Sequence, residues 1–316
     1  MKKIISNTIQ IALYPFTFLA ALLLKLIARL SASGGASDKI FMALGILPVP
    51  DHYYQPLINP KKYLKRPLSD IRNLPGLDLN IEQQLDLLKS FNFNDELLKI
   101  PEKKQDYNKY FHLNKFYELA DAEYLYNLIR HFKPKRIIEI GSGFSTLMAR
   151  NAIGENEKEN PDYSCKHICI EPFENKWLKS LNIELIKAKV ESLDKSIFKE
   201  LERNDVLFID SSHVIRPQGD VLFEILELLP LLNSGVLIHF HDIYTPRDYP
   251  DYLLNKHILW NEQYLLEAFL SNNKEYEIIG ALNYLSCNYK SQLSEKCPVY
   301  ASYPEFVPGA FWIAKK

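Results

Sequence analysis

The chain has few cysteines and almost no net charge, and both features narrow what it can do. Four cysteines occur among 316 residues, and the pair Cys165 and Cys169 has no matching Cys or His pair at the spacing of a zinc site. We therefore expect reduced, structural cysteines and a cytoplasmic protein. The 38 Lys and Arg residues nearly balance the 39 Asp and Glu residues, and no basic stripe with interleaved aromatic residues is present. This balance disfavours a nucleic-acid partner.

Two common nucleotide-binding patterns are also missing. The chain has no GxxxxGK[ST] phosphate loop, and Thr146 stands where the dinucleotide pattern GxGxxG has its third glycine. In their place, a short β-branched run leads into a glycine turn that can open a helix. Glycine lets a ligand approach the backbone, and a helix start offers free N–H groups. We expect a nucleotide-like cofactor here; the alternative is a turn that only packs. The candidate cofactor-binding residues are Glu139, Gly141, Ser142, Gly143 and Ser145.

A second buried-type strand, at 167–171, ends in the acid Glu171. A carboxylate at this place can accept hydrogen bonds from both ribose hydroxyls of a nucleotide-like cofactor. The alternative is that Glu171 is an acid at a helix start, because Pro172 follows it. The distance from Gly143 to Glu171 exceeds the usual spacing of roughly 20 residues. The polar tract 154–162 accounts for the excess as a surface insertion.

The second half of the chain alternates strands and helices, which is typical of a parallel sheet with helices on both faces. A long linker at 283–308 shows no clear helix, so we expect the last strand to run antiparallel. The predicted fold class is α/β, with a doubly wound, seven-stranded, mostly parallel sheet. The expected strands are 136–140, 167–171, 183–187, 206–210, 236–241, 275–280 and 310–315, and the expected helices are 119–132, 145–153, 173–181, 193–202, 217–232 and 258–272.

Two regions precede this α/β domain, which we place at 116–316. Residues 46–115 read as an extension that covers the cleft, with Asn80 capping a helix and Gln83 as its reciprocal partner. Residues 1–45 contain an uncharged stretch, 4–24, that is long enough to cross a bilayer as a helix. A membrane anchor or interfacial helix, a helix packed on the protein or on a partner, and a signal peptide all remain open for this stretch. An anchored chain would face the cytosol.

Acids and histidines follow the fourth and fifth predicted strands. Asp210 and His213 come after the fourth strand, and His241 and Asp242 come after the fifth. The carboxyl ends of parallel strands meet at one edge, so we expect these four catalytic candidates to share a cleft. Asp210, His241 and Asp242 could hold a divalent metal. Alternatively, His213 or His241 accepts a proton from a substrate hydroxyl without a metal. His239 should be a core histidine.

The glycine turn, Glu-x-Gly-x-Gly-x-Ser, resembles motif I of class I S-adenosylmethionine (SAM) methyltransferases, and the expected sheet is theirs. More specifically, the chain resembles the bacterial methyltransferases grouped as methyltransferase domain 24. The segments that carry this resemblance are 121–123, 138–146, 169–172, 208–214, 239–243, 260–265 and 311–313. It implies that SAM is bound by the glycine turn, Glu171 and Asp210. Metal-dependent O-methyltransferases have an Asp-Asn pair after the fifth strand, whereas this chain has His241-Asp242, which departs from a magnesium site.

The resemblance implies a methyltransferase that uses SAM as its cofactor. We expect O-methyl transfer to a small-molecule or glycan hydroxyl, because relatives are often linked to glycan or natural-product pathways. The protein would be cytoplasmic, either free or attached to the cytoplasmic face of a membrane. The alternative is a catalytically inactive, membrane-tethered scaffold or binding protein that retains the fold. A nicotinamide-dependent dehydrogenase is disfavoured by Thr146.

Overall fold

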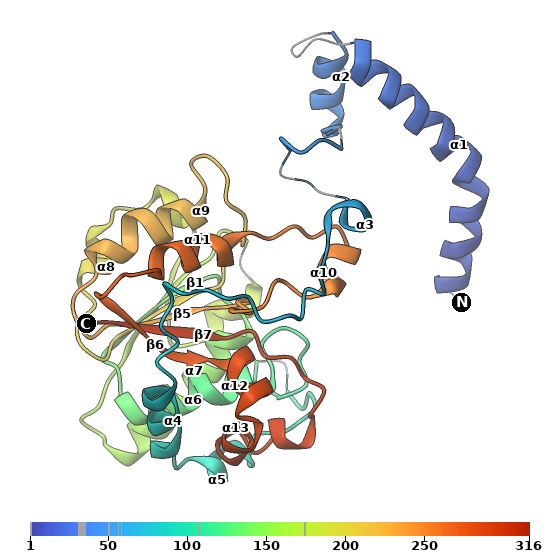
Figure 1. Ribbon diagram of the computed structural model, residues 1–316. Coiled ribbons are helices and arrows are strands. Elements are labelled where there is room, and N and C mark those ends of the chain that lie inside the picture. The colour runs from blue at the N-terminus through green and yellow to red at the C-terminus, as the bar shows by residue number, and fades with distance from the viewer. Residues whose placement is uncertain are drawn as a thin grey trace. The chain divides into compact units, whose positions relative to one another are not determined.

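The structure is a computed structural model that describes residues 2–30, 36–49, 51–55, 57, 59–106, 108–173 and 175–316. The chain forms two compact units, Met1–Pro67 and Leu68–Lys316 (Figure 1). The second unit includes residues 68–115, which the sequence analysis assigned to the extension. The predicted regions 1–45, 46–115 and 116–316 remain predictions.

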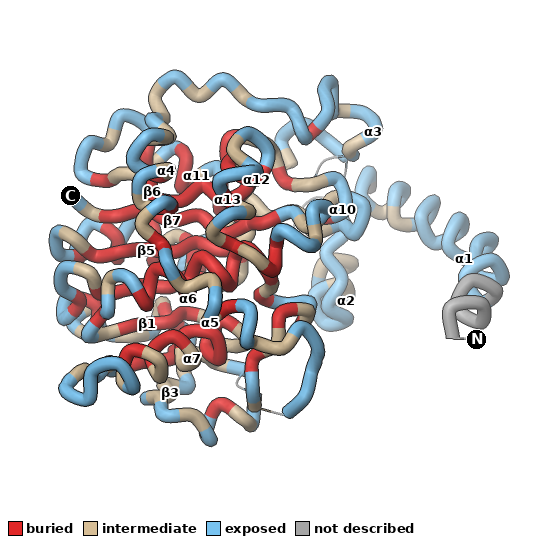
Figure 2. Tube along the Cα trace, turned by 90° about the horizontal axis from the view of Figure 1, so that it is seen from below, coloured by how far each residue is buried: buried red, intermediate tan, exposed pale blue. Residues whose placement is uncertain are grey.

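The described residues of the first unit form three helices, and the first of them is strongly apolar. These helices are α1 (Lys2–Leu30), α2 (Ala36–Leu44) and α3 (Pro60–Tyr63). The stretch Ile9–Arg29 of α1 is long and apolar enough to cross a membrane, and none of it is buried within the structure. Figure 2 shows most of α1 between Ile9 and Arg29 as exposed. The membrane anchor or interfacial helix, the packed helix and the signal peptide therefore all remain predictions for this stretch.

The second unit is built on a seven-stranded sheet with the order β3-β2-β1-β4-β5-β7-β6. β7 runs antiparallel to both β5 and β6, and the other neighbours are parallel. The predicted fold class is therefore confirmed, and each strand lies within two residues of its predicted position. The strands are β1 (Arg136–Ile140), β2 (Lys166–Ile170), β3 (Glu184–Ile186), β4 (Val206–Ile209), β5 (Leu237–Phe240), β6 (Tyr276–Ala281) and β7 (Phe311–Lys315).

Helices cover both faces of the sheet, so the sheet is doubly wound (Figure 1). One apolar cluster joins the sheet to α4 (Ile81–Ser90), α5 (Asn94–Leu97), α6 (Leu119–Phe132), α7 (Phe144–Glu159), α12 (Leu282–Asn288) and α13 (Lys290–Lys296). The opposite cluster joins it to α8 (Ser196–Lys199), α9 (Asp220–Leu222), the π-helical segment Phe223–Leu228 and α11 (Glu262–Leu270). A short helix, α10 (Asp251–Asn255), precedes α11.

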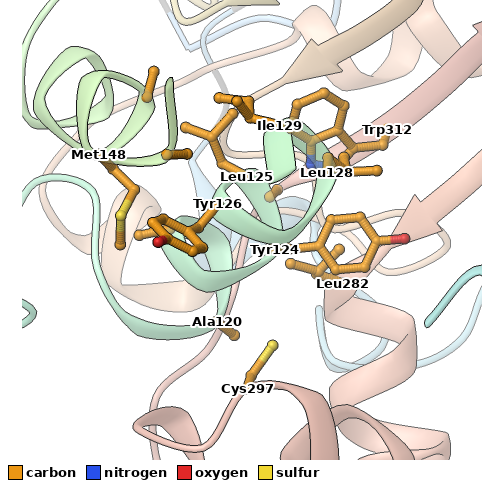
Figure 3. Packing of buried hydrophobic residues seen from close by; sticks show 14 of the residues in the cluster. Ala120, Tyr124, Leu125, Tyr126, Leu128, Ile129, Met148, Leu282, Cys297 and Trp312 are labelled. Atoms are coloured by element: carbon orange, nitrogen blue, oxygen red, sulfur yellow. The ribbon is translucent and has the colours of Figure 1, made fainter. Parts of the chain in front are cut away.

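Large side chains fill the space between α6, α7 and the sheet (Figure 3). Tyr124 and Leu128 of α6, Met148 of α7 and Trp312 of β7 are all fully buried. Each such apolar side chain contributes roughly 1.5–3 kcal/mol of transfer free energy. The Tyr124 hydroxyl also donates a hydrogen bond to the carbonyl of Ile279. This core fixes α7, and therefore the glycine turn that precedes it, against the sheet.

Several predicted local features are wrong. The linker 283–308, in which no helix was expected, contains most of α12 and all of α13. Each helix has only seven residues, so the apolar residues of the linker show no long helical period in the sequence. The predicted helix 173–181 is reduced to a 3-10 turn, Lys176–Ser180. Asn80 does not cap α4 with its side chain: its φ is 53°, and its amide donates to the carbonyl of Ile278. Gln84, and not Gln83, is buried there and accepts a hydrogen bond from the backbone N–H of Ala281.

Candidate active site

The glycine turn between β1 and α7 comes very close to the end of β4. Gly141 has a φ of +78°, and a Cβ atom at this position would lie 1.9 Å from the carbonyl oxygen of Asp210. Only glycine fits such a backbone without strain. A Cβ atom on Gly143 would meet nothing within 4 Å. The turn is therefore packed tightly against β4 at Gly141 and is open at Gly143, where a ligand can approach the backbone.

Glu139 lies beneath this turn and holds it in place. Its side chain is 2% exposed and accepts hydrogen bonds from the hydroxyls of Ser145 and Thr146. It also contacts His167 Nε2 at 3.1 Å and Cys169 Sγ at 3.4 Å. Thr146, which replaces the third glycine of the dinucleotide pattern, also accepts a hydrogen bond from Gly143 N–H. Glu139, predicted to bind the cofactor, therefore positions the turn instead of lining a hollow.

Two adjoining hollows lie in front of the turn, with volumes of about 280 Å³ and about 320 Å³. Both are lined by Gly141, Glu171 and Asp210. The smaller hollow extends along the ends of β2 and β4 to Lys189 and Ser212. The larger one is lined by Phe116, Tyr117, Ser142, Gly143, Phe144, Ser145, Asn175 and Trp177. The structure thus brings together the predicted cofactor residues at one cleft, except Glu139.

The carboxylate of Glu171 is well placed between the two hollows. It accepts hydrogen bonds from the backbone N–H of Ser142 at 3.2 Å and of Phe173 at 2.7 Å. The first of these bonds ties the end of β2 to the glycine turn. The sequence alternative, an acid at the start of a helix at 173–181, loses its basis because no such α-helix forms.

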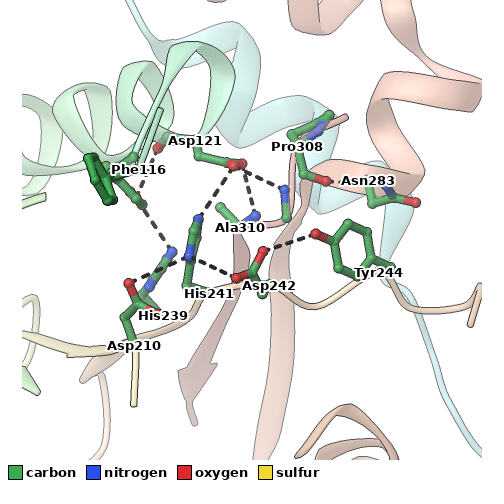
Figure 4. A network of polar contacts seen from close by, with 12 residues as sticks. Phe116, Asp121, Asp210, His239, His241, Asp242, Tyr244, Asn283, Pro308 and Ala310 are labelled. Atoms are coloured by element: carbon green, nitrogen blue, oxygen red, sulfur yellow. Dashed lines mark hydrogen bonds and ion pairs between the residues drawn. The ribbon is translucent and has the colours of Figure 1, made fainter. Parts of the chain in front are cut away.

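A cluster of charged side chains surrounds His241 at the end of β5 (Figure 4). Its Nδ1 atom lies 3.6 Å from carboxylate oxygens of both Asp210 and Asp242. Its Nε2 atom lies 3.7 Å from a carboxylate oxygen of Asp121. Burial opposes the charged imidazole, but the carboxylates of Asp242 and Asp210 outweigh it and raise the pKa of His241 well above 6.5. His241 is therefore charged at neutral pH.

His213 has similar surroundings on the loop after β4. Its Nε2 atom lies 3.2 Å from Asp210 and its Nδ1 atom lies 2.8 Å from Glu262. Burial again opposes the charge, but the hydrogen bonds to Asp210 and Glu262 raise the pKa of His213 to about 10. The ring of Trp260 lies 4.3 Å away and closes this side of the cluster.

These charges change the predicted chemistry of the cleft. An imidazole that carries its proton cannot accept another one, so the raised pKa values of His213 and His241 disfavour both rings as general bases at neutral pH. The same histidine charges hold the pKa of Asp210 well below its ordinary value, against the opposing effect of burial. Carboxylates are the groups left to accept a proton. The raised pKa values therefore disfavour the predicted histidine base, and the structure brings Asp210, His213, His241 and Asp242 together as expected.

The donor set does not fit the predicted metal site. Within the described residues, Asp210, His241 and Asp242 do not form a group whose ligand atoms all lie within 4.8 Å of one another. The ring of His241 supplies the positive charge between the two carboxylates itself. Among the described residues, the side chains close enough to hold an ion are those of Glu139, His167 and Cys169, which are all buried.

His239, two residues before His241 on β5, shows what happens without carboxylates. It is fully buried and stacks on Phe208 with ring centroids 4.0 Å apart. Burial lowers the pKa of His239 well below 6.5, so the ring is neutral. The prediction of a core histidine is confirmed.

The sequence analysis missed three residues that hold the cluster. Asp121 accepts hydrogen bonds from the backbone N–H groups of Gly309 and Ala310, and its carboxylate faces His241. Glu262 pairs with His213, and the Tyr244 hydroxyl donates to Asp242 at 2.9 Å. Asp121 and Glu262 belong to segments that carry the family resemblance. This resemblance was the signal in the sequence that could have identified them as site residues. Their roles depend on contacts between residues distant in sequence.

Fold and site together define a class I methyltransferase. Residues 138–243 match the family described as "Methyltransferase domain". An uncharacterized protein from Archaeoglobus fulgidus is 34% identical over 167 residues, which cover 49% of this chain and 74% of that protein. The chain belongs to this methyltransferase family.

A weaker likeness exists to a crystal structure described as a protein-L-isoaspartate O-methyltransferase from Plasmodium falciparum in complex with S-adenosyl-L-homocysteine. The sequence identity is 18% and the TM-score is 0.25. The match covers 38% of this chain and 56% of that chain, little more than half of its length. A likeness at this level carries no argument about substrate or mechanism.

Proposed function

We propose that this protein transfers a methyl group from SAM to a hydroxyl group of a small molecule or a glycan. The observation that carries the proposal is the cleft in front of the glycine turn, where Gly141, Glu171 and Asp210 line two adjoining hollows. Together the hollows have the size of a pocket for one cofactor-sized ligand.

The residues present fit SAM. The open backbone at Gly143 admits the amino-acid part of the cofactor, and the carboxylate of Glu171 accepts hydrogen bonds from the ribose hydroxyls. Asp210 places a negative charge where both hollows meet, which favours a cationic sulfonium. SAM supplies an electrophilic methyl group when it is bound. The glycine turn, Glu171 and Asp210 provide alignment, which accounts for most of the acceleration expected in such a transfer.

Asp242 is the best-placed group to accept the proton of the acceptor hydroxyl. Asp210 lines both cofactor hollows, whereas Asp242 lines neither and is 20% exposed, so we place the acceptor beside Asp242. One oxygen of Asp242 accepts a hydrogen bond from Tyr244, and the other lies 3.6 Å from the charged ring of His241. These contacts fix the orientation of the carboxylate. His213 and His241 act by positioning the aspartates and not by taking the proton.

The test is the release of S-adenosylhomocysteine from SAM in the presence of hydroxyl-bearing acceptors. The panel should include free sugars, lipid-linked sugars and small phenols, each with a matched analogue in which the hydroxyl is already methylated. We expect turnover with at least one free hydroxyl and none with its methylated partner. Binding of SAM without turnover across the panel would favour the inactive scaffold. Transfer to an amine but to no hydroxyl would contradict the proposed acceptor.

We also propose that α1 attaches the protein to the cytoplasmic face of a membrane. The stretch Ile9–Arg29 has 21 residues, which at about 1.5 Å each give a helix of about 31 Å, close to the bilayer core of about 30 Å. Large apolar side chains such as Phe16, Leu19 and Leu23 are at least half exposed. Cytosolic SAM would then be available to the enzyme.

Flotation of the full chain with phospholipid vesicles tests this attachment. We expect the unchanged chain to float with the vesicles and the double variant Leu19→Lys/Leu23→Lys to stay at the bottom of the gradient. Leu226→Lys is a matched control, because Leu226 is an exposed leucine of the second unit. Equal flotation of the double variant and the unchanged chain would contradict attachment through α1.

A further inference from the structure

A second cavity, of about 470 Å³, lies apart from the cleft and shares none of its lining residues. It is walled by the second half of α7, by Tyr126 of α6 and by the segment after α5. Four cations and two carboxylates line it. The volume is within the range of pockets for small ligands, which is about 300–1,000 Å³. The proposed methyl transfer uses no residue of this cavity.

Arg150 of α7 has an unsatisfied group at this cavity. Its Nη2 atom lies 3.6 Å from a carboxylate oxygen of Glu157. Its Nη1 atom is buried and has no hydrogen-bond partner in the part of the chain that the structure describes. The side chain is 13% exposed. A guanidinium is a planar fork of five N–H donors, and a buried donor without an acceptor is unfavourable. The side chain lines the cavity, so the other N–H donors of the guanidinium face an incoming anion.

The two carboxylates of the cavity are already engaged by cations. Glu96 accepts two hydrogen bonds from Arg130, at 2.8 and 2.9 Å, and one from the Tyr126 hydroxyl. Glu155 pairs with Lys158 at 2.6 Å. These contacts reduce the repulsion that an incoming anion would meet. Lys99 lines the cavity in addition to Arg150, and so does Lys109, which pairs with Asp106 at 2.8 Å.

Gly154 is an unusual residue for the wall of this cavity. It lies inside α7, where glycine is less favourable than alanine. A Cβ atom on Gly154 would meet nothing within 4 Å, so no part of the described chain requires a glycine there. The residue begins the polar tract 154–162, which the sequence analysis interpreted as a surface insertion. The inserted residues, as far as Glu159, extend α7 and build one wall of the cavity.

We propose that this cavity is a second binding site, for a small organic phosphate, in which the guanidinium of Arg150 pairs with the phosphate group. Arginine pairs with phosphate through two parallel N–H···O bonds, and neighbouring lysines add point charges. Tyr126, Ile100 and Pro101 provide an apolar surface for the organic part. The absence of a side chain at Gly154 leaves room for it.

The experiment measures the thermal unfolding of the full chain in rising inorganic phosphate at constant ionic strength, and then in glucose 1-phosphate against free glucose. We expect a saturable increase of Tm with both phosphates and none with glucose, because a ligand that binds only the folded state stabilises it. Arg150→Met should raise the dissociation constant for phosphate about tenfold. Lys199→Met, which changes an exposed cation far from the cavity lining, should leave it unchanged.

A second variant separates binding from folding. Gly154→Leu should raise the Tm of the ligand-free protein, because leucine favours the helix, and should weaken the response to glucose 1-phosphate by filling the cavity. An equal phosphate response in the unchanged chain and in Arg150→Met would overturn the proposal. A response that saturating S-adenosylhomocysteine abolishes would also overturn it, because the phosphate would then lie in the cleft. The proposal does not depend on the proposed methyl transfer.

Discussion

The protein places carboxylates beside histidines in two regions, and the carboxylates of the two regions have different roles. Glu139 is sealed beneath the glycine turn, where it is 2% exposed and receives hydrogen bonds from four side chains. Asp210 and Asp242 lie at the open end of β4 and β5, with side chains that are 33% and 20% exposed. Their closest charged partners are His213 and His241. The buried Glu139 can only stabilise the turn, whereas Asp210 and Asp242 are exposed enough to contact a substrate.

The largest effect on activity should follow from Asp242→Asn. This change removes the proposed proton acceptor but keeps the size of the side chain and its contact with Tyr244. We expect the rate of S-adenosylhomocysteine release to fall about 10²–10⁴-fold, with little change in Tm. Asp251→Asn, at an exposed aspartate of α10, is the control and should keep full activity. A loss of less than about tenfold in Asp242→Asn would mean that another group takes the proton.

The largest effect on stability should follow from Glu139→Ala. This change leaves the hydroxyls of Ser145 and Thr146 and the ring of His167 without their buried acceptor, and it creates a cavity. We expect the free energy of unfolding in urea to fall by about 3 kcal/mol. Glu202→Ala, at an exposed glutamate, should change it by less than about 0.5 kcal/mol. Loss of SAM binding without loss of stability in Glu139→Ala would show that Glu139 contacts the cofactor after all.

A smaller effect, confined to cofactor binding, is expected from Glu171→Ala. The carboxylate of Glu171 is only half-buried, so its loss should change Tm little. The dissociation constant for S-adenosylhomocysteine should rise about 10–100-fold, because hydrogen bonds to a charged acceptor contribute about 1.5–3 kcal/mol. Calorimetric titration measures this change, and Glu184→Ala on β3 provides the control. An unchanged dissociation constant would remove the ribose role from Glu171.

A separate effect should be a pH dependence of stability. The folded-state pKa of His213 is about 10, above the ordinary value of 6.5. Its contribution to stability is therefore fully present below pH 6.5 and is lost as pH rises through about 10. We expect the unchanged chain to lose more stability over this range than His213→Gln does. Urea unfolding at a series of pH values gives the comparison, and parallel curves for the two proteins would contradict a charged His213.

Local patterns were enough to predict the sheet and the cofactor turn. The strands are marked in the sequence by runs of β-branched residues. The turn is marked by the spacing of Gly141, Gly143 and Ser145, because the positive φ at Gly141 requires a glycine. The grouping of Asp210 with His241 was predictable for a similar reason, since the ends of neighbouring parallel strands meet at one edge.

The charge states of the histidines could not be read from the sequence. His239 lies on β5 and His241 directly follows this strand, yet the pKa of His239 is lowered and that of His241 is raised. The difference comes from the adjacent Asp242 and from carboxylates on two other segments, Asp210 after β4 and Asp121 on α6. The role of Glu139 was also hidden, because its partners occupy α7 and β2. Both cases depend on which distant side chains share a buried space.

The most direct test of the account is calorimetric titration of the full chain with S-adenosylhomocysteine. We predict binding of one ligand per chain, weakened in Glu171→Ala and unchanged in Glu184→Ala. Absence of binding to well-folded protein, or equal binding in all three proteins, would contradict a cofactor held between the glycine turn and the acid that follows β2.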